Sequence, residues 1–215
     1  MKFTYRAALP ALLLLGAAWA SATAGTLAVQ VTDAAGKPLV DVVVVADPES
    51  AEGMPKSGKP AEIEQRGLKF LPLVSVIQAG SRIAFPNNDK VRHHIYSFSP
   101  AKKFDQKLYS GVAAAPQLFD KPGTVVLGCN IHDRMIAYVK VVESAYFSKT
   151  DAAGVAHIEL PMPGKYKVSA WHYHMAGAAL EQSVALKSEA SAPLSFKLTI
   201  KPPAAESEAG GMAGF

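Results

Sequence analysis

The chain is built from short runs in which apolar and polar residues alternate, separated by turn residues. Residues 26–48 read TLAVQVTDAAGKPLVDVVVVADP, where apolar runs flank an Asp-Ala-Ala-Gly-Lys-Pro turn. Residues 147–171 read FSKTDAAGVAHIELPMPGKYKVSAW, with two more such runs around a Pro-Gly turn. Alternation with a period of two predicts strands on both sides of each turn.

The middle of the chain continues this pattern. Strands are predicted at LPLVSVIQ and SRIAF, split by Ala79-Gly80, and then at HHIYSF, QLFD, TVVLGC and MIAYVKVV. Two more are expected at EQSVALK and PLSFKLTI, whereas PESAEGMPKSGKPA indicates a loop. Residues 202–215 lack periodicity and are expected to form a disordered tail. The pattern therefore predicts an all-β protein.

The N-terminus has the features of a signal peptide. Lys2 and Arg6 precede an apolar stretch too short to span a bilayer, and Ala22-Thr23-Ala24 is a small-residue cleavage site, so residues 1–24 are expected to be removed. A cut after Ala22 or Ala20 is an alternative. The mature protein is then expected in a bacterial periplasm. Losing Lys2 and Arg6 lowers the formal net charge of +4 by two, too little to indicate nucleic-acid binding.

With 215 residues, 49% of them hydrophobic, the chain can bury one or two cores, but it has a single cysteine. An intramolecular disulfide framework and four-cysteine metal cages are excluded, so Cys129 is inert, intermolecular, catalytic or a metal ligand. The run GCNIHDRM holds Cys129, His132 and Met135, and His93 lies on an earlier strand. Each residue alone is compatible with a structural role. Together, two imidazoles, a thiolate and a thioether are the ligand set of a blue-copper electron-transfer site.

The surrounding segments resemble a known family. PNNDKVRHHIYSF and VVLGCNIHDRMIAYVKV are similar to the two copper-ligand segments of the cupredoxins, the plastocyanin and amicyanin family, and the likeness covers residues 61–143. It implies one type 1 copper held by His93, Cys129 and His132, with Met135 as the axial ligand. Within the family, the chain resembles plastocyanin-like proteins labelled methylamine-utilisation proteins.

Two positions depart from the cupredoxin pattern. His94 stands where the family commonly has Asn, and Gly128 replaces the usual aromatic residue before the cysteine. Because adjacent strand residues point to opposite faces, His94 is expected to lie outside the ligand set. The resemblance therefore leaves the surroundings of the copper, and its reduction potential, open.

A second resemblance concerns the two ends of the chain. TDAAGKPL and TDAAGVA, with LPMPGKYKV, are similar to the opening and closing strands of a carboxypeptidase-regulatory-like, transthyretin-like or Ig-like β-sandwich. This resemblance implies a discontinuous sandwich of residues 25–50 plus 144–201, into which a cupredoxin-like Greek-key domain of residues 51–143 is inserted. In the alternative, Thr26 to Asp47 form an edge of one single sandwich.

Other candidate chemistry is weaker. His172 and His174, in WHYHM, lie on one strand face and could bind copper or zinc, but no thiolate or carboxylate is near in sequence, which favours a polar strand end. His157 is expected to be structural. The chain has no His-Glu-x-x-His, Gly-x-Ser-x-Gly or phosphate-loop motif, so no catalytic residues and no enzyme activity are expected.

The sequence thus predicts a periplasmic carrier of single electrons. Two alternatives remain: a protein that stores or delivers copper, and a structural or carbohydrate-binding β-sandwich without metal. Lys90, Arg92 and Arg134 lie within a few residues of His93 and His132, so we expect a redox partner with an acidic docking patch.

Overall fold

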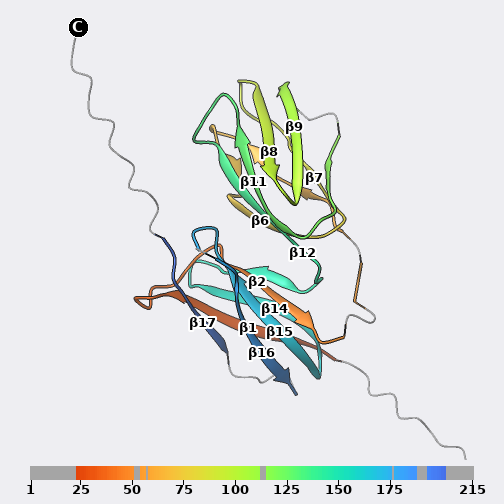
Figure 1. The fold of residues 1–215 in the computed structure, drawn as a ribbon, viewed down its shortest axis with the longest axis vertical. Helices are drawn as coiled ribbons and strands as arrows, with labels where there is room; N and C mark the ends of the chain where they lie inside the picture. Colours follow the sequence, from red (N-terminus) through yellow and green to blue (C-terminus); the bar gives the residue numbers. More distant parts are fainter. Residues whose placement is uncertain are drawn as a thin grey trace, which may run out of the picture.

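Two β-sandwiches stacked along the long axis of the molecule make up the structure (Figure 1). The computed structural model describes residues 23–50, 54–56, 58–111, 115–175, 177–187 and 193–201, and these contain strands and turns but no helix. The expectation of an all-β fold is confirmed. Each sandwich has its own buried apolar cluster.

The lower sandwich in Figure 1 joins the first strands of the chain to the last ones. One sheet has the order β14-β1-β17 and the other β13-β2-β15-β16. The strands are β1 (Thr23–Asp33), β2 (Val43–Pro48), β13 (Phe147–Lys149), β14 (Val155–Met162), β15 (Gly164–Trp171), β16 (Leu180–Leu186) and β17 (Leu194–Leu198). β1 pairs antiparallel with β14 and parallel with β17, and β2 pairs with β13 and β15.

The repeated Thr-Asp-Ala-Ala-Gly sequence forms the same turn twice. The Asp33 carboxylate accepts hydrogen bonds from the backbone amides of Ala35 and Lys37, and the Asp151 carboxylate accepts the equivalent bonds from Ala153 and Val155. Such side-chain bonds to the backbone two residues on are what favours Asp in turns. The strands on either side of each turn lie in different sheets, so each turn carries the chain from one sheet of the sandwich to the other.

The upper sandwich has a five-stranded sheet, β6-β12-β11-β8-β9, and a three-stranded sheet, β10-β7-β3. The strands are β3 (Ala61–Glu62), β6 (Val74–Gln78), β7 (Ser81–Ala84), β8 (His93–Ser99), β9 (Lys102–Tyr109), β10 (Gln117–Phe119), β11 (Gly123–Cys129) and β12 (Ile136–Val142), and a small hairpin joins β4 (Glu64–Gln65) to β5 (Phe70–Leu71). The sequence pattern missed β9. Its outward positions carry Lys and Asp, and the alternation is weak.

A third apolar cluster lies where the two sandwiches meet. Val74 and Val142 of the upper sandwich pack with Val43 and Val45 of the lower one. The rings of Tyr138 and Tyr173 stack with centroids 4.8 Å apart, and the Lys140 ammonium lies 5.0 Å from the centre of the Trp171 ring. The outward face of β6 and β12 is therefore covered, while that of β8, β9 and β11 is not.

Two predictions concern residues outside the ranges that the structure describes. Residues 1–22, most of the predicted signal peptide, and residues 202–215, the predicted tail, lie outside the described residues. Thr23 and Ala24 belong to β1, so a cut after Ala24 would remove the first two residues of this strand, whereas the alternative cuts after Ala22 and Ala20 leave it whole. Over the described ranges, no helix has the length and apolar character needed to cross a membrane.

Candidate metal centre

The three strongest candidate ligands converge at one end of the upper sandwich. His93 is the first residue of β8 and Cys129 the last of β11, and the pairing of Cys129 with Ile95 brings these strand ends together. His132 follows in the loop to β12. One potential donor atom from each of His93, Cys129 and His132 lies within 4.8 Å of the other two, and no other such group of His, Cys, Asp or Glu occurs in the described part of the chain.

The spacing of the donor atoms fits a metal ion. The Cys129 Sγ atom is 3.8 Å from Nδ1 of His93 and 3.9 Å from Nδ1 of His132. Metal–sulfur and metal–nitrogen bonds of about 2.3 and 2.0 Å that open at about 120° separate the two donor atoms by about 3.7 Å. A thiol has one proton and cannot satisfy two imidazole nitrogens at once, whereas a central cation satisfies all three atoms.

Burial differs among the three candidate ligands. His93 and Cys129 are 0% and 3% exposed, and His132 is half-buried. A soft thiolate and two imidazoles suit copper in both of its common oxidation states, and the apolar core around Cys129 keeps water away from the sulfur.

Met135 lies beside this group. It is 1% exposed, belongs to the same apolar cluster as Cys129, and its backbone amide donates a hydrogen bond to the carbonyl of His132. Cys129 and Met135 also line one surface groove. Its sequence position and burial fit the axial position, which stays a prediction.

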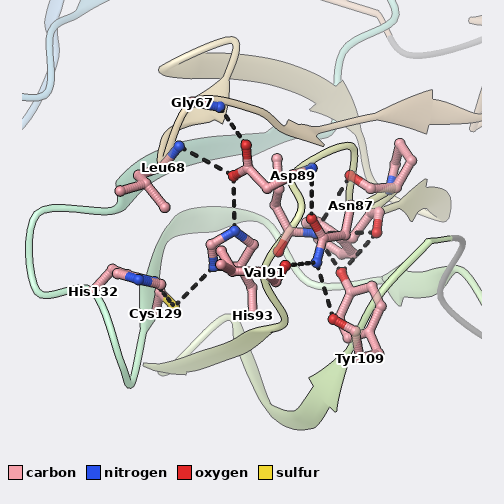
Figure 2. A network of polar contacts seen from close by, with 12 residues as sticks. Gly67, Leu68, Asn87, Asp89, Val91, His93, Tyr109, Cys129 and His132 are labelled. Carbon is pink, nitrogen blue, oxygen red and sulfur yellow. Dashed lines mark hydrogen bonds and ion pairs between the residues drawn. The ribbon is translucent and has the colours of Figure 1, made fainter.

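Asp89, which the sequence analysis did not single out, contacts the ring nitrogen of His93 that faces away from Cys129. Asp89 Oδ2 lies 2.8 Å from Nε2 of His93, and the same carboxylate accepts hydrogen bonds from the backbone amides of Gly67 and Leu68 (Figure 2). Burial opposes ionisation of Asp89, but the bonds from His93, Leu68 and Gly67 outweigh it and lower the pKa of this carboxyl. The only available signal was its place four residues before His93.

The two departures from the cupredoxin pattern have structural explanations. His94 does not belong to the group of candidate ligands and is paired with the Asp105 carboxylate. At Gly128, a Cβ atom would lie 2.8 Å from the ring of Tyr96, because this ring lies directly over the glycine. An aromatic ring from the neighbouring strand thus occupies the space beside Gly128.

The other histidines do not join a metal-sized group. The rings of His172 and His174 have centroids 5.5 Å apart, but no third His, Cys, Asp or Glu of the described chain completes a site there. His172 is 5% exposed, and its Nδ1 accepts a bond from the His174 amide. Burial and the neighbouring His174 lower the pKa of His172 to about 4. His157 is exposed on β14.

Fold and site together define an all-β protein with a His-Cys-His centre at one end of a sandwich. No family model and no curated protein matches the chain. Solved structures that resemble it include a purple cupredoxin from Nitrosopumilus maritimus, with 22% identity, a TM-score of 0.35, and 38% of this chain and 99% of that chain covered. Amicyanin from Paracoccus versutus has 18% identity and a TM-score of 0.36, over 46% of this chain and 97% of its own. A copper-containing nitrite reductase from Thermus scotoductus has 23% identity and a TM-score of 0.37, over 45% of this chain and 25% of its own.

Proposed function

We propose that the protein is a type 1 copper protein that carries single electrons between redox partners. The observation that carries the proposal is the convergence of His93 Nδ1, His132 Nδ1 and Cys129 Sγ at distances that fit one ion. Met135 is proposed as the axial ligand. When bound, the copper supplies a one-electron couple between Cu(II) and Cu(I).

The residues around the copper would determine how it exchanges electrons. Buried His93 and Cys129 exclude water and hold their donor atoms in fixed positions, so little reorganisation is needed when the charge changes. Half-buried His132 is the proposed exit toward a partner. Because the protein supplies four ligands, no position is left open for a substrate, and we propose a carrier and not an enzyme.

The partner is proposed to carry an acidic patch. Exposed Lys69 and Arg134 line a hollow beside His132, and exposed Arg66, Lys90 and Arg92 lie nearby along the chain. Opposing charge there comes from exposed Asp133 and from Glu64, whose carboxylate lies 3.5 Å from the Arg66 guanidinium, while Asp89 is bonded to His93. A basic surface around the electron exit attracts an acidic partner.

We further infer that residues 51–143 form a copper domain inserted in a transthyretin-like sandwich of residues 25–50 and 144–201, and that the protein is exported. Separate apolar clusters and the pairing of β1 and β2 with strands after residue 144 support the division. Mass spectrometry of the protein from a periplasmic fraction tests export, with a mature N-terminus between residues 21 and 25 expected.

Optical and electron-paramagnetic-resonance spectra of the Cu(II)-loaded protein test the copper proposal. We expect an intense visible thiolate-to-copper band, which Cys129→Ser and His93→Gln abolish. The matched control His94→Gln keeps the band, because His94 lies outside the group. A colourless, tightly bound Cu(II) in the unmodified protein contradicts the proposal. Loss of Cu(I) to a chelator during redox cycling indicates copper delivery instead.

A further inference from the structure

The loop before His93 is held in place by a hairpin distant in sequence. In the β4–β5 hairpin, Arg66 N donates to the carbonyl of Lys69, and both central residues have left-handed backbones, with φ of 63° at Gly67 and 57° at Leu68. Two positive φ values in a two-residue connection are the mark of a type I′ turn.

Leucine is an unusual residue for this conformation. A residue with a Cβ atom has a steric penalty at positive φ, and Leu68 as a whole is 47% exposed. Backbone hydrogen bonds compensate for this conformation, because the amides of Gly67 and Leu68 both donate to Asp89, with bonds of 2.6 and 3.1 Å to its two carboxylate oxygens. Successive amides of this kind form a concavity that binds an anion.

Asp89 is fixed from its own side of the contact as well. Its backbone amide donates to Oδ1 of Asn87, and the Asn87 side-chain amide donates to the carbonyls of Val91 and Tyr109 (Figure 2). The backbone of Gln65 also bonds twice to this loop: its amide donates to the carbonyl of Pro86, and its carbonyl accepts from the amide of Asn88. The carboxylate therefore has little freedom to leave His93.

We propose that Asp89 is a positioning residue for the metal centre, which keeps the proton of His93 on Nε2 and so presents a bare Nδ1 to the metal beside Cys129. The carboxylate is an acceptor only, so the shared contact requires His93 Nε2 to donate. A histidine that donates to a carboxylate is a stronger metal ligand, and the added negative charge favours Cu(II) over Cu(I). The effect on copper rests on the function proposed above, whereas the effect on His93 does not.

The first experiment needs no metal. In the ¹H–¹⁵N spectrum of the copper-free protein, we expect the Nε2 proton of His93 far downfield and protected from exchange with water. Asp89→Asn, whose side chain offers one oxygen in place of two, moves this signal upfield or removes it. The matched control is Asp133→Asn, which removes a carboxylate from exposed Asp133 in the ligand loop and leaves the signal unchanged. A freely exchanging Nε2 proton in the unmodified protein overturns the proposal, whether or not the variant folds.

The second experiment measures the copper couple. Loss of an outer partner of a metal-bound histidine typically weakens metal affinity by about 10-fold or more. If Asp89→Asn weakens Cu(II) about tenfold more than Cu(I), the reduction potential rises by about 59 mV. Asp133→Asn is expected to shift it by much less. Equal shifts of the reduction potential in the two variants overturn the positioning role of Asp89. If the protein binds no copper, the proposed function is wrong, and the ¹H–¹⁵N spectrum of His93 still tests the role of Asp89.

Discussion

Nδ1 of His93 and Sγ of Cys129 lie 3.8 Å apart, although 36 residues separate them in the sequence. The register of β8 against β11 sets this distance, because Cys129 pairs with Ile95 at the end of both strands. The loop after Cys129 then turns back so that His132 faces the same sulfur at 3.9 Å. The core of the sandwich, and not the loop alone, therefore determines the geometry of the site.

Met135→Leu tests the axial ligand. We expect the visible band to remain and the reduction potential to rise, because loss of a weak axial donor favours Cu(I). A tenfold change in relative affinity corresponds to about 59 mV for one electron. The control is Met162→Leu in the lower sandwich, since Met135 and Met162 are both 1% exposed. Cyclic voltammetry measures the shift, and equal potentials in all three proteins remove Met135 from the site.

Gly128→Ala tests the packing of Tyr96. The new Cβ would meet Cζ and Oη of the Tyr96 ring at 2.8 and 2.9 Å, so the ring must move, at a cost of about 1 kcal/mol in unfolding free energy. In a Tyr96→Ala background the same change should cost close to nothing. Urea unfolding of the four copper-free proteins gives the coupling between the two positions. Additive costs would show that Gly128 is required for another reason.

The sequence singled out the candidate ligands but not the residue that supports His93. Cys129, His132 and Met135 share one short loop between two apolar strands, so spacing alone pointed to a metal site, and His93 completed a recognisable ligand set. Asp89 could not be assigned in this way. Its role depends on Gly67 and Leu68, more than twenty residues away, and on backbone amides that no side-chain pattern encodes.

The fold shows the same division between local and distant information. Alternation located most strands, and the Asp33 turn was readable because an Asp side chain bonds to its own turn, as Asp151 also does. The pattern did not show that the strands on either side of these turns lie in different sheets. That assignment depends on β1 pairing with β14 and β17, whose contacts are distant in sequence.

His172 predicts a pH dependence of stability. Its pKa is about 4 in the folded protein, below the ordinary value of 6.5, because burial and His174 disfavour the charged form. Between these values the unfolded chain holds a proton that the folded protein lacks. The contribution of His172 is therefore complete above pH 6.5 and is lost as the pH falls toward 4, by at most about 1.4 kcal/mol per pH unit.

Denaturant unfolding of the copper-free protein between pH 4 and 7 measures this slope. His172→Asn keeps an acceptor for the amide of His174 but does not titrate in this range, so we expect a shallower slope. His157→Asn, at an exposed position, serves as the control and should keep the slope of the unmodified protein. Identical slopes for the two variants would contradict the assignment to His172.

The basic surface beside His132 predicts opposite salt effects for oppositely charged reactants. Lys69 and Arg134 are exposed at the hollow next to this histidine. The Cu(I) protein should therefore react faster with anionic hexacyanoferrate(III) than it would if this surface were uncharged. Its rate constant should fall as salt rises, while the rate with cationic tris(phenanthroline)cobalt(III) should increase. Arg134→Glu is expected to weaken both trends, and Lys197→Glu on β17 of the other sandwich to leave them nearly unchanged. Stopped-flow kinetics measure both rate constants. If the rate constant with hexacyanoferrate(III) stays constant or rises with salt, electrons leave through a surface that is not basic, and the proposal of a partner with an acidic patch is wrong.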